Sequence, residues 1–177
     1  MNVKIKALKS LFKIGYWKCR YGSRLKMPWI QGFDRVYIEL SKKGHMSFGV
    51  RNENRGKMHF ICAGEGQLEI GNHVIYAIGG CITCMGHIKI GDYCRLGNNV
   101  VIVDHDHNIK NQDSEFLIGE IVIGDNVWIG ANCTILKDVH IGNNCAIAAG
   151  SVVREDVPDG TIYYQKKTGV CVPMKQT

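Results

Sequence analysis

The sequence predicts an all-β fold, a parallel β-helix, with a short helical arm at its N-terminus and one protruding loop. Three observations support this class. Ile, Leu or Val recurs at every sixth residue, often followed by Gly; the six-residue frame breaks once; and the segment from Met1 to Phe33 is basic and contains no acid. The 177 residues suffice for one domain with a sizeable core.

The six-residue repeat defines the β-helix. A period of six fits neither a helix nor a simple alternating strand. In a parallel β-helix each hexad supplies one short strand and one corner, and three hexads close a coil. We therefore expect the first and fifth residues of each hexad to point inward. The first positions are Ile90, Leu96, Ile102, Ile123, Ile129, Ile135, Ile141, Ile147 and Val153, and the fifth are Cys94, Val100, Val127, Cys133, Val139, Cys145 and Ser151.

The single break in the frame predicts a loop. The separation of Ile102 and Ile123 along the chain is not a multiple of six, so residues 108–120 must leave the coil. Upstream the repeat is less clean, and we expect Ile70, Ile82 and Ile88 to point inward. This gives a basic arm or cap over 1–41, a β-helix domain over 42–162 and a tail over 163–177.

Composition excludes several classes of protein. No run of about 18 apolar residues occurs, and the basic N-terminus lacks the apolar region and cleavage site of a signal peptide. We therefore expect a cytoplasmic protein whose eight cysteines are reduced. Eight of the 22 Lys and Arg residues lie within residues 1–33, so the rest of the chain holds 14 basic against 16 acidic residues. The body is not a nucleic-acid binder.

The stretch Asp104-His105-Asp106-His107 closes the last hexad before the loop. The frame places Asp106 in the inward fifth position and both histidines on the outer side. Histidine titrates near neutral pH and can accept a proton from a hydroxyl. Either aspartate is near enough in sequence to orient a histidine ring, and the sequence does not decide between them.

A metal site is the alternative use of these histidines. Zinc sites of β-helix enzymes resembling carbonic anhydrase need a pair of histidines five residues apart, and none of the seven histidines is spaced in this way. The frame also points Cys81 and Cys84 in opposite directions, so they would not converge on zinc. We expect no metal.

The block IGDNVWIGANCTILKDVHIGNNCAIAAGSVVREDVP resembles the last coils of the hexapeptide-repeat acyltransferases, which have a left-handed β-helix. The resemblance covers roughly residues 42–162 and is nearest to the maltose and galactoside O-acetyltransferase group and to related enzymes of surface polysaccharides. It implies direct transfer of an acetyl group from acetyl-CoA to a sugar or glycan hydroxyl. It also implies a homotrimer with each active site between two β-helices.

The resemblance implies a role for particular residues. It makes His107 the general base by position, with His105 as the less favoured base or an orienting neighbour. It places Trp128 beside the thioester and Ala131 and Ala149 along the pantetheine arm. The CoA phosphates would then meet Arg154, Lys166 and Lys167, where the tail TIYYQKKTGVCVP departs from the family pattern. The segment AIGGCIT stands where the galactoside group has an asparagine, so acceptor identity does not carry over.

Other functions remain open on the sequence alone. A small-molecule or antibiotic acetyltransferase of the same fold would share these motifs. A zinc enzyme resembling carbonic anhydrase would need the missing histidine pair. A non-catalytic β-helix scaffold would transfer no acetyl group to any acceptor.

The arm fits a helix over residues 3–16 with two distinct faces. Ile5, Leu8, Phe12 and Tyr16 share one face, and Lys6, Lys9 and Lys13 form a basic stripe on another. Such a helix suits an anionic membrane surface, here the inner face of the cell membrane. Equally, it could cap the open end of the β-helix and cover its strand edges.

Overall fold

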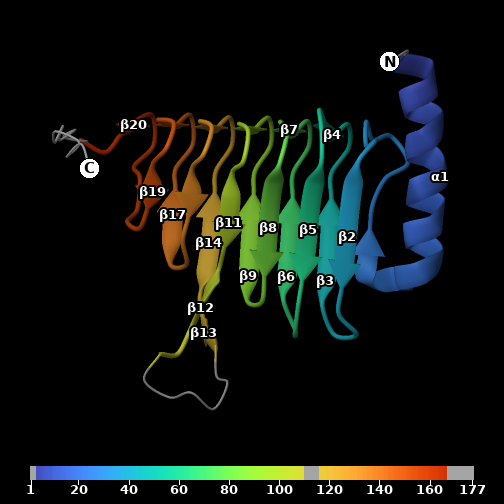
Figure 1. Cartoon of the computed structure of the whole chain (residues 1–177), viewed down its shortest axis with the longest axis horizontal. Coiled ribbons are helices and arrows are strands. Elements are labelled where there is room, and N and C mark those ends of the chain that lie inside the picture. Colours follow the sequence, from blue (N-terminus) through green and yellow to red (C-terminus); the bar gives the residue numbers. More distant parts are fainter. Residues whose placement is uncertain (1–2, 110–115, 167–177) are drawn as a thin grey trace, which may run out of the picture.

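A computed structural model describes residues 3–109 and 116–166. The chain forms a solenoid of stacked coils with one long helix, α1 (Val3–Tyr21), lying across its N-terminal end (Figure 1). A short 3-10 turn, η1 (Gly22–Arg24), leads from α1 into the first strand.

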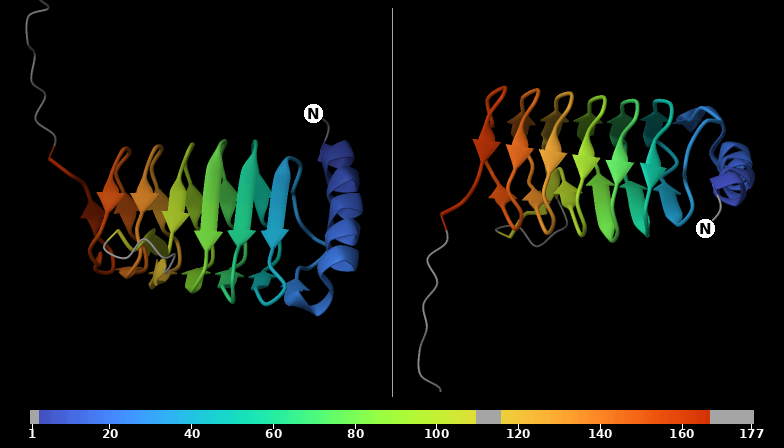
Figure 2. Two further views of the ribbon diagram at one scale, coloured as in Figure 1. Left: turned by 60° about the horizontal axis from the view of Figure 1, so that its bottom comes forward. Right: turned by 90° about the horizontal axis from the view of Figure 1, so that it is seen from above.

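Three parallel six-stranded sheets form the sides of the solenoid, and the chain visits them in turn (Figure 2). Sheet A contains β1 (Leu25–Lys26), β3 (His45–Phe48), β6 (Gln67–Ile70), β9 (His87–Ile90), β14 (Glu120–Ile123) and β17 (Val139–Ile141). Sheet B contains β4 (Glu53–Asn54), β7 (Ile75–Tyr76), β10 (Arg95–Leu96), β15 (Trp128–Ile129), β18 (Ala146–Ile147) and β20 (Ile162–Tyr163). Sheet C contains β2 (Val36–Leu40), β5 (Met58–Cys62), β8 (Gly80–Cys84), β11 (Val101–Val103), β16 (Thr134–Ile135) and β19 (Val152–Val153).

The stacking register confirms three hexads per coil. Trp128 pairs with Ala146, and Thr134 pairs with Val152, so each strand partner lies three hexads further along the chain. Strands β1 and β2 already belong to the sheets, because they pair with β3 and β5.

The expected loop begins as a hairpin. Strands β12 (His105–His107) and β13 (Phe116–Ile118) pair antiparallel and project from the edge where sheet C meets sheet A (Figure 1). Residues 110–115 of the loop lie outside the described residues.

The inward positions are confirmed, with one correction. All the predicted first and fifth residues of the hexads listed above are buried, as are Ile70, Ile82 and Ile88. Asp106, expected inward, is exposed, and Asp104 is the buried aspartate. The reason is that the chain leaves the coil after Asp104, so the following residues obey the alternation of the hairpin.

Side chains bond successive coils at the corner between sheets A and B. At five successive levels a side-chain oxygen accepts the backbone N–H of the coil before it, at 2.7–2.9 Å. The acceptors are Asn72, Asp92, Asp125, Asn143 and Asp159. These bonds satisfy corner N–H groups that no strand partner reaches.

Helix α1 caps the first coil. Ile14, Trp17 and Tyr21 are buried against it, and the Tyr21 hydroxyl donates a hydrogen bond to the Ile38 carbonyl at 2.7 Å. The Ser10 hydroxyl likewise donates to the Gln31 carbonyl at 2.9 Å. This face therefore performs the capping that was one of the two expected roles of the arm.

The opposite face of α1 is open. Phe12 is 75% exposed and Tyr16 is 59% exposed. The side chains of Ile5 and Leu8, expected on the same face, lie outside those described. No helix within residues 3–109 and 116–166 has the length and apolarity needed to cross a membrane.

Candidate active site

The Asp104 carboxylate anchors the base of the hairpin. It is fully buried, and it accepts the backbone N–H of Met85 at 2.9 and 3.1 Å and that of Gly86 at 2.9 Å. Its own carbonyl accepts the N–H of Gly119 at 2.7 Å, where the chain returns to the coil. A buried charge held by this many donors has one fixed position.

His105 is oriented by this carboxylate. Its Nδ1 lies 3.0 Å from Asp104 Oδ1, and only 13% of its side chain is exposed. A hydrogen bond from Nδ1–H to a carboxylate fixes the tautomer, which leaves Nε2 as the proton acceptor. This is the arrangement that a general base requires.

His105 and His107 lie on one face of the hairpin with an aromatic ring between them. Residues opposite each other in an antiparallel pair share a face, and His107 faces Phe116. The Phe116 ring centroid is 4.8 Å from that of His107 and 5.4 Å from that of His105. Asp106 points to the other face, so Asp104 is the aspartate that orients a histidine.

The sequence reasoning missed Phe116 and the role of Gly86. The signal for Phe116 was the apolar triplet Phe-Leu-Ile inside a polar loop, which alternates as a strand partner for His-Asp-His. At Gly86 a Cβ atom would lie 2.4 Å from the Gly119 carbonyl oxygen. Glycine is therefore required where the returning chain crosses the coil.

Trp128 is exposed on sheet B, as expected for a sixth hexad position. Its side chain is 62% exposed in β15, between Arg95 and Ala146 of the neighbouring coils. Ala131 and Ala149 follow at the corner between sheets B and C, where Ala131 is half-buried and Ala149 is exposed. A Cβ on Gly130 would lie 2.6 Å from the Ala149 nitrogen, so this corner is tightly stacked.

The residues expected to contact the CoA phosphates lie apart from Trp128 and the two alanines. Arg154 is exposed just after β19, at the same edge of the solenoid as the hairpin. Lys166 is exposed beyond β20, next to Gln165, whose amide bonds both backbone groups of Val152 at 2.9 and 3.1 Å. Lys167 lies outside the described residues.

The predicted site residues therefore form two groups on different sides of one chain. The histidines and Arg154 lie along the edge between sheets C and A, where the hairpin projects in Figure 1. Trp128 lies on sheet B, and Ala131 and Ala149 on the corner beyond it. One chain does not bring the two groups together.

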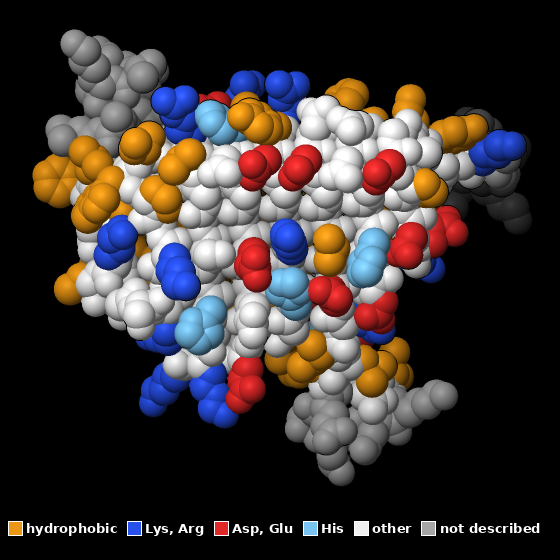
Figure 3. Space-filling model, turned by 180° about the vertical axis from the view of Figure 1, so that it is seen from behind, with side chains coloured by type: hydrophobic (Ala, Val, Ile, Leu, Met, Phe, Trp, Pro, Cys, Tyr) orange, Lys and Arg blue, Asp and Glu red, His pale blue; other side chains and the backbone are white. Residues whose placement is uncertain are grey.

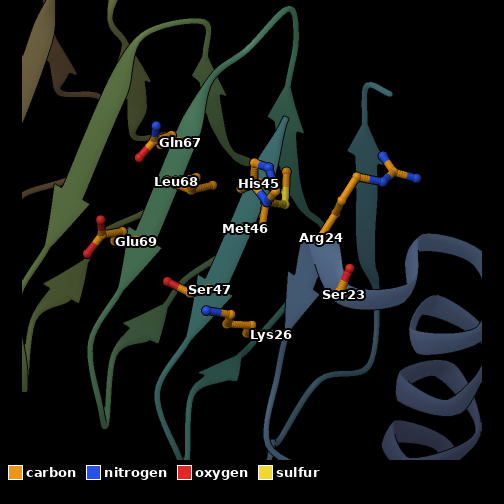
Figure 4. Close-up of a pocket in the computed structure, with 9 residues that line it drawn as sticks. All are labelled: Ser23, Arg24, Lys26, His45, Met46, Ser47, Gln67, Leu68 and Glu69. Carbon is orange, nitrogen blue, oxygen red and sulfur yellow. The ribbon is translucent and has the colours of Figure 1, made fainter. Parts of the chain in front are cut away.

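A separate hollow lies on sheet A beside α1 (Figure 4). Its volume is about 260 Å³, and its polar lining includes Lys26 of β1, Ser47 of β3 and Glu69 of β6. It contains none of the predicted site residues. Over residues 3–109 and 116–166, no cluster of three or more His, Cys, Asp or Glu side chains is arranged to hold a metal ion.

Part of the six-residue repeat matches a known protein family. Residues 120–155 match the family described as "Bacterial transferase hexapeptide (six repeats)". The match spans strands β14 to β19 of the solenoid. The putative acetyltransferase YvoF of Bacillus subtilis is 44% identical over 73 residues, which are 41% of this chain and 40% of YvoF. The chain thus spans less than half the length of this curated relative.

Solved structures share the fold over most of this hexapeptide-repeat chain. A hexapeptide-repeat acetyltransferase from Vibrio cholerae, complexed with acetyl coenzyme A, has a TM-score of 0.51 and 23% identity, covering 91% of this chain and 84% of its own. The N-acyltransferase AntD from Bacillus cereus, complexed with dTDP and coenzyme A, has a TM-score of 0.64 and 19% identity, covering 84% and 82%. At these identities the likeness shows the fold.

Proposed function

We propose that this protein is an acetyl-CoA-dependent O-acetyltransferase that acetylates a sugar hydroxyl during the synthesis of a surface polysaccharide such as a capsule or O-antigen. The observation that carries the proposal is the pairing of buried Asp104 with His105 on the hairpin that leaves the coil. The match of residues 120–155 to the bacterial transferase hexapeptide family and the exposed Trp128 support it.

The chemistry asks for one oriented base. A sugar hydroxyl must lose its proton as it attacks the thioester carbonyl of acetyl-CoA, and the acetyl group then passes to the sugar oxygen while CoA leaves as the thiol. His105 Nε2 would accept that proton, because Asp104 holds the other ring nitrogen. The geometry thus favours His105 as the base. The position implied by the sequence resemblance favours His107 instead. His107 shares its face and would contact the acceptor or the thioester.

A complete site would need two copies of the chain. The histidines of one copy and Trp128, Ala131 and Ala149 of another would line a shared cleft, as in the homotrimer that the sequence resemblance implies. Exposed apolar residues on the hairpin support such a contact, since Leu117 is 48% and Ile118 54% exposed. Acetyl-CoA would lie along the alanine corner, with Arg154 and Lys166 or Lys167 near its phosphates.

The outward face of α1 would rest on the anionic inner face of the cell membrane, where lipid-linked glycans are assembled. Leu11, Phe12 and Tyr16 are exposed there, and the segment from Met1 to Phe33 carries eight basic side chains and no acid. Viewed from behind, hydrophobic, Lys and Arg side chains gather at this end of the molecule (Figure 3). A second copy is a poor partner for this face, since two positively charged arms repel.

The test of the function is acetyl transfer from acetyl-CoA to a panel of glycans, measured by mass spectrometry. The wild-type protein should acetylate at least one glycan, and His105→Ala should lower the rate by about 10² to 10⁴. His107→Ala should lower it less. Loss of transfer in His107→Ala with a normal rate in His105→Ala would make His107 the base, and no transfer to any acceptor would reject the function.

A further inference from the structure

Sheet B carries a groove on the N-terminal side of Trp128. It has a volume of about 410 Å³ and is lined by Arg51, Glu53, His73, Ile75, Tyr93 and Arg95. Two columns of outward side chains build it. Glu53, Ile75 and Arg95 are stacked in register on β4, β7 and β10. The other three lining residues form the adjacent corner.

The corner column has an unusual composition. Arg51, His73 and Tyr93 have positive φ angles of 58°, 56° and 58°. The next two coils place Asn126 and Asn144 at the equivalent position, with φ of 55° and 56°. Asparagine tolerates this left-handed conformation, whereas a bulky residue there is strained. Three large side chains are thus held where the fold itself favours asparagine, and such strain is typical of ligand sites.

The groove offers the chemistry of carbohydrate and anion binding together. The His73 and Tyr93 rings are stacked face to face, with centroids 4.9 Å apart and planes 8° apart, so they form an ordered aromatic pair at the corner of the groove. Arg51 and Arg95 are exposed, and a guanidinium binds carboxylate or phosphate oxygens in a bidentate manner. Glu53 can accept hydrogen bonds from hydroxyl groups.

The groove continues directly to the proposed transfer centre. Arg95 is the strand partner of Trp128, so the two side chains stand on adjacent coils, about 4.8 Å apart along the sheet. The alanines proposed for pantetheine follow Trp128 on the C-terminal side. The groove lies on the opposite, N-terminal side of Trp128, so an acceptor held in it would lie next to a thioester placed beside Trp128.

We propose that this groove binds the acceptor and selects an anionic glycan, one that carries a carboxylate or a phosphate near the acetylated hydroxyl. Arg51 and Arg95 bind the acidic group, the His73 and Tyr93 rings line the sugar, and Glu53 bonds its hydroxyls. That the bound glycan is an acetyl acceptor rests on the proposed function. Binding of the glycan in the groove does not require catalysis.

The experiment measures binding without acetyl-CoA, on a panel of uronic acid glycosides, sialylated glycans, sugar phosphates and matched neutral hexosides. Wild type should bind anionic members at least roughly tenfold more tightly than their neutral counterparts, and salt should weaken the binding. The class that binds, carboxylated or phosphorylated, identifies the source of the charge. Retention of neutral glycans alone, or of none, overturns the proposal.

Variants separate binding from folding. Arg51→Asn introduces the residue that the corner favours, so the melting temperature should hold or rise while anionic glycan binding falls roughly tenfold or more. Arg95→Gln should weaken binding similarly, and Arg35→Gln, an exposed arginine outside the groove, should not. Unchanged binding in both groove variants would refute the assignment.

A parallel transfer assay separates this inference from the proposed function. Acetylation of neutral sugars only would leave the function standing and sink the groove assignment. Arginine-dependent binding of anionic glycans without any acetyl transfer would support the groove assignment and reject the proposed function.

Discussion

At the scale of single residues, Asp104 connects the coil, the hairpin and His105. Its carboxylate accepts N–H groups of the coil below, its carbonyl closes the hairpin, and its charge orients His105. The six-residue frame predicted that Asp106 would point inward here, whereas the inward aspartate is Asp104. The frame ends where the chain departs from the coil, and that point depends on the hairpin pairing, which hexad spacing does not encode.

Asp104→Asn tests this role. The amide keeps the shape of the side chain but loses the charge that fixes the His105 tautomer, so kcat should fall by about 10² to 10⁴ while the KM for acetyl-CoA changes little. The measurement is steady-state acetyl transfer, with circular dichroism to confirm the β-helix. A variant with wild-type kcat would show that His105 is not the base.

Tyr76 shows a residue-scale conflict inside the core. It is 1% exposed and its hydroxyl is the buried side-chain group that lacks a hydrogen-bond partner among the described residues. Burial raises the pKa of Tyr76 well above its ordinary value. Tyr76→Phe removes the unpaired hydroxyl and keeps the edge-to-face contact with Phe60.

We therefore expect Tyr76→Phe to raise the free energy of unfolding by about 1 kcal/mol, since an unsatisfied buried hydroxyl costs roughly 1–3 kcal/mol. Chemical denaturation of both proteins measures the difference. A destabilised variant would show that the hydroxyl has a partner, such as a buried water.

At the scale of elements, α1 has one buried face and one exposed face. The sequence grouped Phe12 with Tyr16 and offered capping and membrane contact as alternatives. The structure buries the face that contains Ile14, Trp17 and Tyr21 and leaves Phe12 and Tyr16 outside. The face that the sequence grouped as apolar is thus the open one, and the sequence did not identify the capping face, because large residues lie on both sides of the helix.

Substitutions on the two faces should have separate effects. Trp17→Ala should lower stability by about 3–5 kcal/mol, as expected for a large buried side chain. The double variant Phe12→Ser/Tyr16→Ser should shift stability by no more than about 0.5 kcal/mol. It should bind vesicles containing phosphatidylglycerol more weakly than wild type does, in co-sedimentation at low salt. Equal binding by both proteins, or no binding by wild type, would reject membrane contact by this face.

At the scale of the whole molecule, the repeat predicted the solenoid, its inward residues and the outward Trp128. It could not reveal that Trp128 and the histidines stand on different sides of one chain, because the loop between them interrupts the six-residue frame, so the count of hexads no longer assigns the sheet. The groove on sheet B also escaped it, because Arg51 and His73 lie in the early coils, where the repeat is irregular.

Mixed oligomers test whether the two sides meet across subunits. His105→Ala and Trp128→Ala should each be weakly active alone. Co-refolding them should restore part of the activity, because some interfaces then combine an intact histidine with an intact tryptophan. No gain over the separate variants, with mixed oligomers confirmed by mass spectrometry, would place both residues in a site formed by one chain.

The corners of the coil have a consequence for how such a protein can change through evolution. Ile75, Arg95, Trp128 and Ala146 stand in register on successive coils, although unequal lengths of chain separate each from the next. Insertions are absorbed at corners and do not shift the strands. A lineage could therefore lengthen the hairpin or change the side chains of a corner while the neighbouring coils keep their strand register.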